Sequence, residues 1–313
     1  MTAVGVFLPQ VRMDFATIEG KVRAAEEAGY HSVWFMDHLA PPAGPQLDCF
    51  EGWTLASAVA ARTSRVRIGH LVLCDPLRHP AVLAKMAATL DVISGGRLEL
   101  GLGWGSVASE LHTFGVSEDP APVRAARLGE TLDILALLFS GEEVDYAGRF
   151  YRLSGAMARP RPVHGHIPVH IGGAGPLLTM PLVARHADWW NCPSYAVDRL
   201  SSLRPLAGTR ARLSVQHPIG LAPSTATRDD IVSVAQRRFA GWGGLITGTP
   251  DEVAAALRRE VSLGAELFVL QFSDFASPAT LRLFADEVLP ALELPGSTPD
   301  IPDIPGSAPR TLQ

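Results

Sequence analysis

Short apolar runs and longer amphipathic stretches alternate along most of the chain. The runs 4–8, 32–36 and 66–73 are almost continuously apolar, which is typical of strands buried on both faces of a parallel sheet. The stretches between them repeat apolar residues at helical spacing, and the first ends at Gly29, a residue that suits a helix C-terminus. The pattern predicts strands over 4–8, 32–36, 66–73, 97–102, 168–171, 187–191, 213–221 and 266–272, and helices over 16–28, 52–63, 81–93, 123–139, 176–185, 249–263 and 279–289.

This order of elements predicts an α/β fold. Roughly eight strand–helix units fit the 313 residues, which favours a single (β/α)8 TIM barrel with insertions over an open, doubly wound sheet. We expect the barrel to occupy residues 1–291. Residues 144–153 interrupt the rhythm and are predicted to form a hairpin, and 222–248 are predicted to carry an insertion. Residues 292–313 are rich in proline and lack an apolar period, so we expect a disordered tail.

Composition excludes several classes of partner. The formal net charge is −5 and no basic block occurs, so we expect neither nucleic acid nor a membrane as a partner. No apolar run is long enough to span a bilayer. The three cysteines are widely spaced and form no CxxC motif, which argues against a disulfide scaffold or a zinc site and favours a cytoplasmic location.

An acid and an imidazole stand side by side where the second predicted strand ends, in "SVWFMDHL". Active sites of (β/α)8 barrels lie at the carboxyl ends of the strands, so Asp37 and His38 are candidate catalytic residues. The pKa of an unperturbed histidine lies near working pH, and Asp37 is positioned to orient His38 or to shift its pKa. The alternative is that the two residues are polar side chains that form hydrogen bonds at the end of the strand and have no catalytic role.

Glycines follow two further strands. Gly172, Gly173, Ala174 and Gly175 come between a strand and a helix, where unpaired N–H groups can bind a phosphate. A tight turn is the alternative, and no Walker motif follows. The run 101–105, "GLGWG", predicts a flat glycine wall against a ring system, with Trp104 as a side wall. Its alternative is a strand end that needs small residues.

Other polar residues suggest no further chemistry. His164, His166 and His170 stand at or before the strand predicted over 168–171, on the face of the barrel that serves stability, so we predict no metal site. A GxSxG motif is absent, so a serine hydrolase is unsupported. Arg78 is the nearest candidate for binding an anionic substrate, and the alternative is a solvated or structural residue.

Taken together, these motifs resemble the bacterial luciferase-like monooxygenase superfamily, whose members are (β/α)8 barrels that bind FMN or the deazaflavin coenzyme F420. The resemblance covers most of residues 1–290. It is carried by "RHPAVLAKMAATLDVISGGRLELGLGWG", by "PVHIGGAG" and by "GTPDEVAAALRREVSLGAELFVLQF".

The resemblance implies roles for individual residues. The glycine-rich loop 172–175 would hold the cofactor phosphate. A non-prolyl cis peptide is expected between Gly69 and Leu73, behind the cofactor ring. His38 and Asp37 match a pair that contacts the cofactor or substrate. The ring would pack over Leu71, Val72, Leu73, Gly101, Leu102 and Gly103.

One departure from the family concerns the substrate. A glutamate that donates a proton in a sugar-phosphate dehydrogenase branch has no match, because Trp104 stands near that place. This departure from the family suggests an apolar or aromatic substrate packed against Trp104.

Three functions remain open. The first is a redox enzyme that moves a hydride between coenzyme F420 and a small organic substrate. The second is an FMN-dependent two-component monooxygenase, in which a reductase supplies reduced flavin, a flavin peroxide attacks the substrate, and 144–153 or 241–248 serves as a lid. The third is a catalytically silent flavin-binding barrel. A homodimer is expected, packed through the helices predicted over 52–63 and 81–93.

Overall fold

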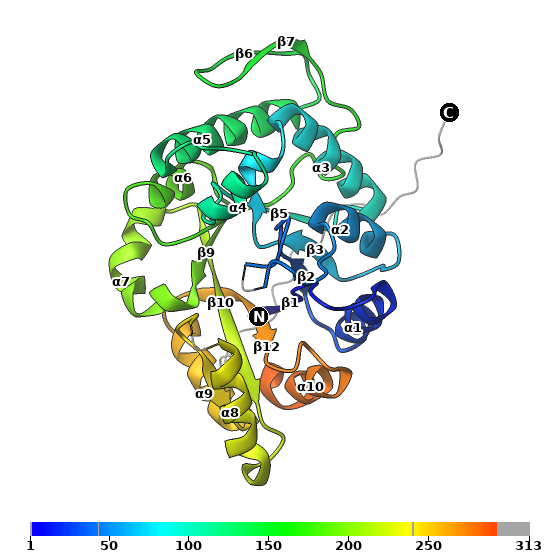
Figure 1. The fold of residues 1–313 in the computed structure, drawn as a ribbon, viewed down its shortest axis with the longest axis vertical. Coiled ribbons are helices and arrows are strands. Elements are labelled where there is room, and N and C mark those ends of the chain that lie inside the picture. Colours follow the sequence, from blue (N-terminus) through cyan, green and yellow to red (C-terminus); the bar gives the residue numbers. More distant parts are fainter. Residues whose placement is uncertain (1, 43, 240, 293–313) are drawn as a thin grey trace.

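The computed structural model describes residues 2–42, 44–239 and 241–292. Parallel strands form a closed barrel surrounded by helices (Figure 1), and the barrel closes because β10 pairs with both β9 and β12. The predicted (β/α)8 barrel is confirmed. The barrel strands, in chain order, are β1 (Ala3–Phe7), β2 (Ser32–Phe35), β3 (Arg67–His70), β5 (Leu98–Gly103), β8 (Val169–Gly172), β9 (Trp189–Pro193), β10 (Arg212–Leu221) and β12 (Ala265–Phe272).

The helices around the barrel begin and end on local signals. Asp14 caps the first helix by accepting the N–H of Thr17, and Gly95 ends the third helix with a φ of 67°. Thr249 and Glu252 form a capping box at the ninth helix. The helices are α1 (Phe15–Glu27), α2 (Gly52–Ala60), α3 (Pro80–Ser94), α4 (Ala108–Thr113), α5 (Ala121–Leu138), α6 (Thr179–His186), α7 (Leu200–Leu203), α8 (Arg228–Phe239), α9 (Pro250–Val261) and α10 (Pro278–Leu283).

Alternation along the strands divides the apolar residues between two cores. Val4, Val6 and Val33 face outward and are buried against the helices, in one large cluster. Their neighbours along each strand, such as Phe7 and Trp34, face inward. These inward side chains fill the barrel as a second, smaller cluster. This inner cluster contains Phe7, Trp34, Met36, Leu71, Trp189, Leu267 and Val269.

The third strand is interrupted. β3 ends at His70, the Leu71–Val72 peptide bond is cis, and the chain resumes as β4 (Leu73–Cys74), which pairs with β5. The predicted non-prolyl cis peptide between Gly69 and Leu73 is confirmed. This bulge requires glycine at Gly101, because a Cβ atom there would lie 1.9 Å from the carbonyl oxygen of His70.

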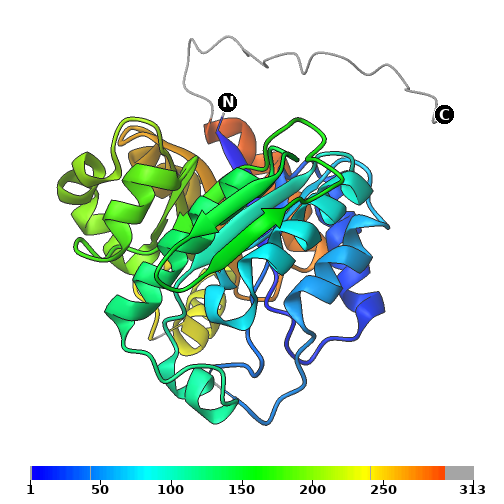
Figure 2. The same cartoon turned by 90° about the horizontal axis from the view of Figure 1, so that it is seen from above.

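The two irregular segments have distinct structures. The predicted hairpin is confirmed as antiparallel strands β6 (Val144–Ala147) and β7 (Arg152–Ala156), which lie outside the layer of α3 and α5 (Figure 2). The predicted insertion in 222–248 contains α8 and β11 (Ile246–Gly248), and β11 pairs with β10 as a further parallel strand.

Several boundaries differ from their predictions by a few residues, as the start of α6 and the C-terminal end illustrate. The helix expected from residue 176 begins at Thr179, because Gly175 accepts the N–H groups of both Thr179 and Met180 and the residues between form a turn. Leu292 ends the last 3-10 turn, and the rest of the predicted disordered tail lies outside the described residues. Within the described ranges, none of the helices has both the length and the apolar character needed to cross a membrane.

Candidate active site

A pocket of about 670 Å³ opens at the carboxyl ends of the barrel strands. Gly101 and Leu102, although predicted to support the cofactor ring, do not line it. Leu102 alternates outward into the core under the helices, and Gly101 lies beneath the bulge of the third strand. The predicted residues that do line the pocket are Asp37, His38, Leu71, Val72, Leu73, Gly103, Trp104, Gly172, Gly173, Ala174 and Gly175.

Val72 explains why several of these positions are glycine. A Cβ atom at Gly103 would lie 2.6 Å from Cγ2 of Val72, and one at Gly172 would lie 3.0 Å from Cγ1. These glycines therefore make room for the bulged strand. Val72 and the bare strand backbone form an apolar wall of the pocket, in place of the flat glycine wall expected from the sequence.

The loop after β8 offers unpaired backbone donors. Gly173 has a φ of 125°, which other residues rarely adopt, and its N–H bonds the carbonyl of Asn191 at 3.1 Å. The N–H groups of Ala174, Gly175 and Leu177 have no hydrogen-bond partner among the described residues. A cradle of this kind, close to the start of α6, fits a phosphate group.

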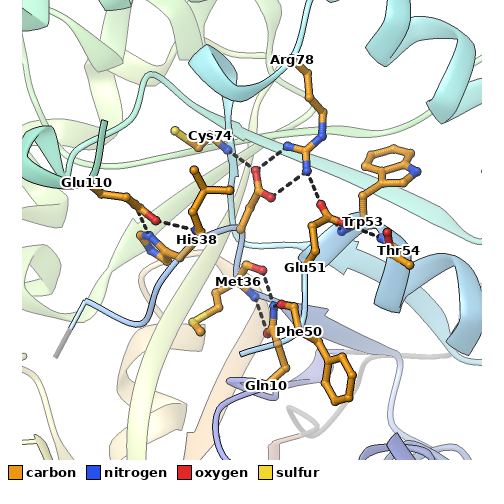
Figure 3. Close-up of polar contacts among 12 residues, drawn as sticks. Gln10, Met36, His38, Phe50, Glu51, Trp53, Thr54, Cys74, Arg78 and Glu110 are labelled. Atoms are coloured by element: carbon orange, nitrogen blue, oxygen red, sulfur yellow. Dashed lines mark hydrogen bonds and ion pairs between the residues drawn. The ribbon is translucent and has the colours of Figure 1, made fainter. Parts of the chain in front are cut away.

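His38 is paired with a carboxylate that the sequence did not reveal. Its Nδ1 atom lies 2.7 Å from Oε2 of Glu110, a residue of α4 (Figure 3). The other oxygen, Oε1, accepts the N–H of Leu39 at 2.6 Å and that of Ala40 at 3.3 Å. Because Glu110 acts as an acceptor on both oxygens, the proton of neutral His38 resides on Nδ1. The Nε2 atom is then left as the basic nitrogen.

The prediction that Asp37 orients His38 is wrong. Asp37 accepts two hydrogen bonds from Arg78, at 2.6 and 2.9 Å, and a third from the N–H of Cys74 at 2.8 Å. Arg78 also bonds Glu51 at 2.7 Å and lies over the ring of Trp53. Asp37 thus joins the end of β2 to the start of β4 and fixes the bulge between them.

Cys74 lines the same pocket without being a nucleophile. The pKa of its thiol is raised to about 12, mainly by burial and further by the charge of Asp37. The thiolate is therefore scarce near neutral pH.

Comparison with known proteins identifies the family. Residues 2–202 match the family model described as luciferase-like monooxygenase. The chain belongs to the luciferase-like monooxygenase family. An "F420-dependent glucose-6-phosphate dehydrogenase" of Amycolatopsis mediterranei is 36% identical to it, over 89% of this chain and 95% of that protein.

Solved structures agree on the fold of this luciferase-like protein. An "F420-dependent secondary alcohol dehydrogenase in complex with an F420-acetone adduct" superimposes with a TM-score of 0.80 at 20% identity, over 93% of this chain and 99% of that one. A monooxygenase from Streptomyces bottropensis has a TM-score of 0.75 at 26% identity, over 92% and 99% of the two chains. The proteins similar to this chain thus include both F420-dependent dehydrogenases and monooxygenases.

Trp104 lines the pocket of this family member, with its indole fixed from two sides. Its Nε1 donates to Oγ1 of Thr179 at 3.3 Å, and the guanidinium carbon of Arg124 lies 5.5 Å from the ring centroid. The tryptophan therefore connects the end of β5 with the first residue of α6, close to the glycine-rich loop.

Sequence reasoning missed several residues of the pocket, among them Glu110, Tyr195 and Gln216. Glu110 carried a usable signal, since it is a carboxylate in the segment that follows the fourth barrel strand, β5. Tyr195 and Gln216 carried none, because strand-end position alone does not separate them from their neighbours. Both line the pocket from the β9–β10 side.

Proposed function

We propose that this protein transfers a hydride between coenzyme F420 and a small organic substrate, with His38 as the proton acceptor or donor. The observation that carries the proposal is the His38–Glu110 pair, which shares one pocket with the bulge of Val72 and the unpaired N–H groups of residues 174–177. The relative from Amycolatopsis mediterranei, named as F420-dependent, supports this choice of cofactor.

The residues present fit such a cofactor. Leu71 and Val72 offer an apolar surface for a ring, and the loop around Gly173 offers donors for a phosphate. When bound, the deazaflavin supplies a carbon centre that accepts or delivers a hydride. The protein then has to hold the substrate and move one proton.

His38 is suited to moving that proton. The Nδ1–H group donates to Glu110, so Nε2 is free to take the hydroxyl proton of an alcohol as the hydride leaves its carbon. In the reverse direction, the same nitrogen returns the proton to the carbonyl oxygen. Glu110 stabilises the imidazolium form and keeps the ring oriented, as its remaining oxygen is fixed by two backbone N–H groups.

A second candidate function is an FMN-dependent monooxygenase that receives reduced flavin from a partner reductase. The observation that favours it is the 26% identity to the Streptomyces bottropensis monooxygenase over nearly the whole chain. Of the two segments considered as lids, the hairpin 144–153 contributes no residue to the pocket. The segment 241–248 lies behind Tyr195, where Gly243 accepts a hydrogen bond from Ser194 at 2.8 Å.

A paired titration of the purified protein with coenzyme F420 and with FMN, followed by cofactor fluorescence, tests the proposal. We expect F420 to bind at least about tenfold more tightly, a difference of about 1.4 kcal/mol. Tighter binding of reduced FMN, together with oxygen consumption, would instead establish the monooxygenase. Binding of neither cofactor would reject both functions.

We further propose a homodimer in the cytoplasm. Val82, Val92 and Ile93 of α3 are about half exposed, which supports packing of this helix against a second copy. Cys49, Cys74 and Cys192 are free thiols, in agreement with a reducing compartment. Size-exclusion chromatography with light scattering measures the molar mass and so checks the dimer. The variant Ile93→Glu is expected to shift the monomer–dimer equilibrium toward the monomer.

A further inference from the structure

The charge of the pocket points to a substrate class. We infer that the substrate is an uncharged alcohol or carbonyl compound with an apolar remainder, and that phosphorylated sugars are excluded. This inference rests on the proposed function and concerns the part of the pocket beyond the glycine-rich loop. It separates this chain from the relative that is named for glucose-6-phosphate.

No cation lines the pocket. Among the described residues that line it, none is lysine or arginine, whereas Asp37 and Glu110 contribute carboxylates. A phosphate monoester carries up to two negative charges and would lie beside the carboxylate of Glu110 without a compensating cation. Burying such an anion unpaired is strongly unfavourable.

The nearest guanidinium groups are already occupied. Arg78 has bonded Asp37 and Glu51, and its side chain is 12% exposed. Arg124 donates to the carbonyl oxygens of Gly105 and Asp119 and is buried against Trp104. Neither group can turn toward a substrate without breaking these bonds.

The backbone donors of the glycine-rich loop do not replace the missing cation. In the proposed function, the loop around Gly173 holds the cofactor phosphate. A second phosphate, on the substrate, would therefore find no donor set of comparable strength in the described pocket.

The β9–β10 side of the pocket offers polar groups without charge. The Nδ2 atom of Asn191 donates to Oγ of Ser214 at 3.1 Å, whereas the side-chain carboxamide of Gln216 makes no hydrogen bond within the described ranges. A carboxamide both donates and accepts, so Gln216 can bind a hydroxyl or carbonyl oxygen. This wall suits recognition of an uncharged oxygen.

The rest of the pocket edge is apolar. Leu177 is 86% exposed and Tyr195 is 63% exposed, and both line the pocket together with Trp104. Apolar side chains left open at a mouth gain most from covering a hydrocarbon or aromatic group. The substrate is thus expected to place its oxygen inside and its apolar part against these residues.

Binding to the F420-loaded protein tests the inference. Calorimetric titrations with 1-phenylethanol, acetophenone, 2-octanol and glucose-6-phosphate are compared at low and high salt. We expect at least one neutral compound to bind and to exchange a hydride with the cofactor anaerobically, with an affinity that changes less than twofold with salt. Glucose-6-phosphate is expected neither to bind nor to inhibit at about 10 mM.

The outcomes separate this inference from the proposed function. Saturable binding of glucose-6-phosphate that weakens with salt would overturn the substrate class. Failure of every neutral compound to bind, with F420 still bound, would overturn it as well while leaving the cofactor assignment intact. Failure to bind F420 would reject the proposed function itself.

A variant supplies the missing cation. Gln216→Arg places a guanidinium on the uncharged wall, and we expect inhibition by glucose-6-phosphate to appear, with an inhibition constant at least tenfold below the concentration of about 10 mM that leaves the parent protein uninhibited. Gln216→Met is the matched control, since it has similar length and no charge, and it should leave glucose-6-phosphate inert. An equal response of both variants would contradict the inference. The affinity of each variant for F420 is measured as well, and a value equal to that of the parent protein indicates that the pocket is intact.

Discussion

Two histidine–glutamate pairs with the same nitrogen–oxygen distance lie at different depths of the barrel. The open pair, His38–Glu110, has a separation of 2.7 Å and side chains that are 25% and 9% exposed. The sealed pair, His170–Glu99, also has a separation of 2.7 Å, but its side chains are 1% and 5% exposed. Along β8, His170 precedes the pocket residue Gly172 by two residues, so the sealed pair lies one layer below the pocket on that strand.

The surroundings give these pairs different capacities. The sealed pair is closed by Trp189, which stacks on His170, and by Trp34, which meets its edge. Burial by itself would raise the pKa of Glu99, but the hydrogen bond from His170 and the nearby charges of His170 and Arg67 lower it to about 2. No ligand can reach this pair. The open pair keeps a ring nitrogen in the pocket, so only there can a proton pass to a substrate.

The sealed pair also corrects an expectation from the sequence. His170 was expected on the face that serves stability, at or near the start of a strand. It lies inside β8 and within the barrel, and its Nδ1 atom is buried without a hydrogen-bond partner in the described structure. Its role is structural all the same, because it joins β5 to β8 through Glu99.

Removing the imidazole of the open pair gives the largest expected effect. General acid–base catalysis typically contributes about 10²–10⁴-fold, so His38→Ala should lower kcat by that factor with little change in Tm. Steady-state kinetics with any substrate found for the F420-loaded protein provide the measurement. Unchanged kcat would remove His38 from the mechanism, and His112→Ala, which alters an exposed histidine, serves as the control.

Breaking the sealed pair should act on stability. Glu99→Ala removes the carboxylate that neutralises both Arg67 and His170, and a broken buried ion pair typically costs about 3–5 kcal/mol. The free energy of unfolding, from denaturant titration, is expected to fall by that amount. Glu118→Ala, at an exposed pair with His112, should change it by less than about 1 kcal/mol. Equal effects of the two variants would contradict the distinction between buried and exposed pairs.

The pH dependence of stability should report the same carboxylate. Since the pKa of Glu99 falls from 4.5 to about 2 on folding, its contribution is complete above pH 4.5 and is lost as the pH falls toward 2. That shift corresponds to about 3 kcal/mol. Glu99→Gln should flatten the free energy of unfolding between pH 4.5 and 2. Identical slopes for variant and parent would refute the low pKa.

A change in the glycine-rich loop should weaken cofactor binding. Gly173→Asp places a negative charge and a strained φ beside the proposed phosphate site, where a Cβ atom would lie 3.2 Å from Cγ2 of Thr179. The Kd for F420 is expected to rise at least about tenfold, or 1.4 kcal/mol. Gly165→Asp is the control, because Gly165 also has a positive φ but no neighbour near its Cβ position. An unchanged Kd would remove the loop from the phosphate site.

The smallest effect is expected at the tryptophan of the pocket wall. Trp104→Phe keeps an aromatic ring but loses the hydrogen bond to Thr179, which typically contributes about 0.5–1.5 kcal/mol. We expect KM for a neutral substrate to rise about threefold, with kcat nearly constant. A fall in kcat without a change in KM would place Trp104 in the chemistry instead of the substrate wall.

Much of the fold and part of the site followed from local pattern. Continuous apolar strands alternating with amphipathic helices predicted the barrel, and strand-end position brought Asp37, His38 and the loop at Gly173 into view. Gly101 and Leu102 shared that position along the chain and yet do not line the pocket. The neighbouring sequence did not reveal that the bulge at Val72 would cover Gly101. It also did not reveal that the side chain of Leu102 would face outward, toward the helices.

The amino-acid sequence by itself determined the architecture, the family and the end of the barrel that carries the site, because periodicity, caps and glycine placement act over a few residues. Only the tertiary structure decided which groups pair there. Asp37 meets Arg78 from 41 positions away, and His38 meets Glu110 from 72 positions away. Such contacts depend on how neighbouring strands are placed in the closed barrel, and side-chain chemistry alone does not choose among several possible partners.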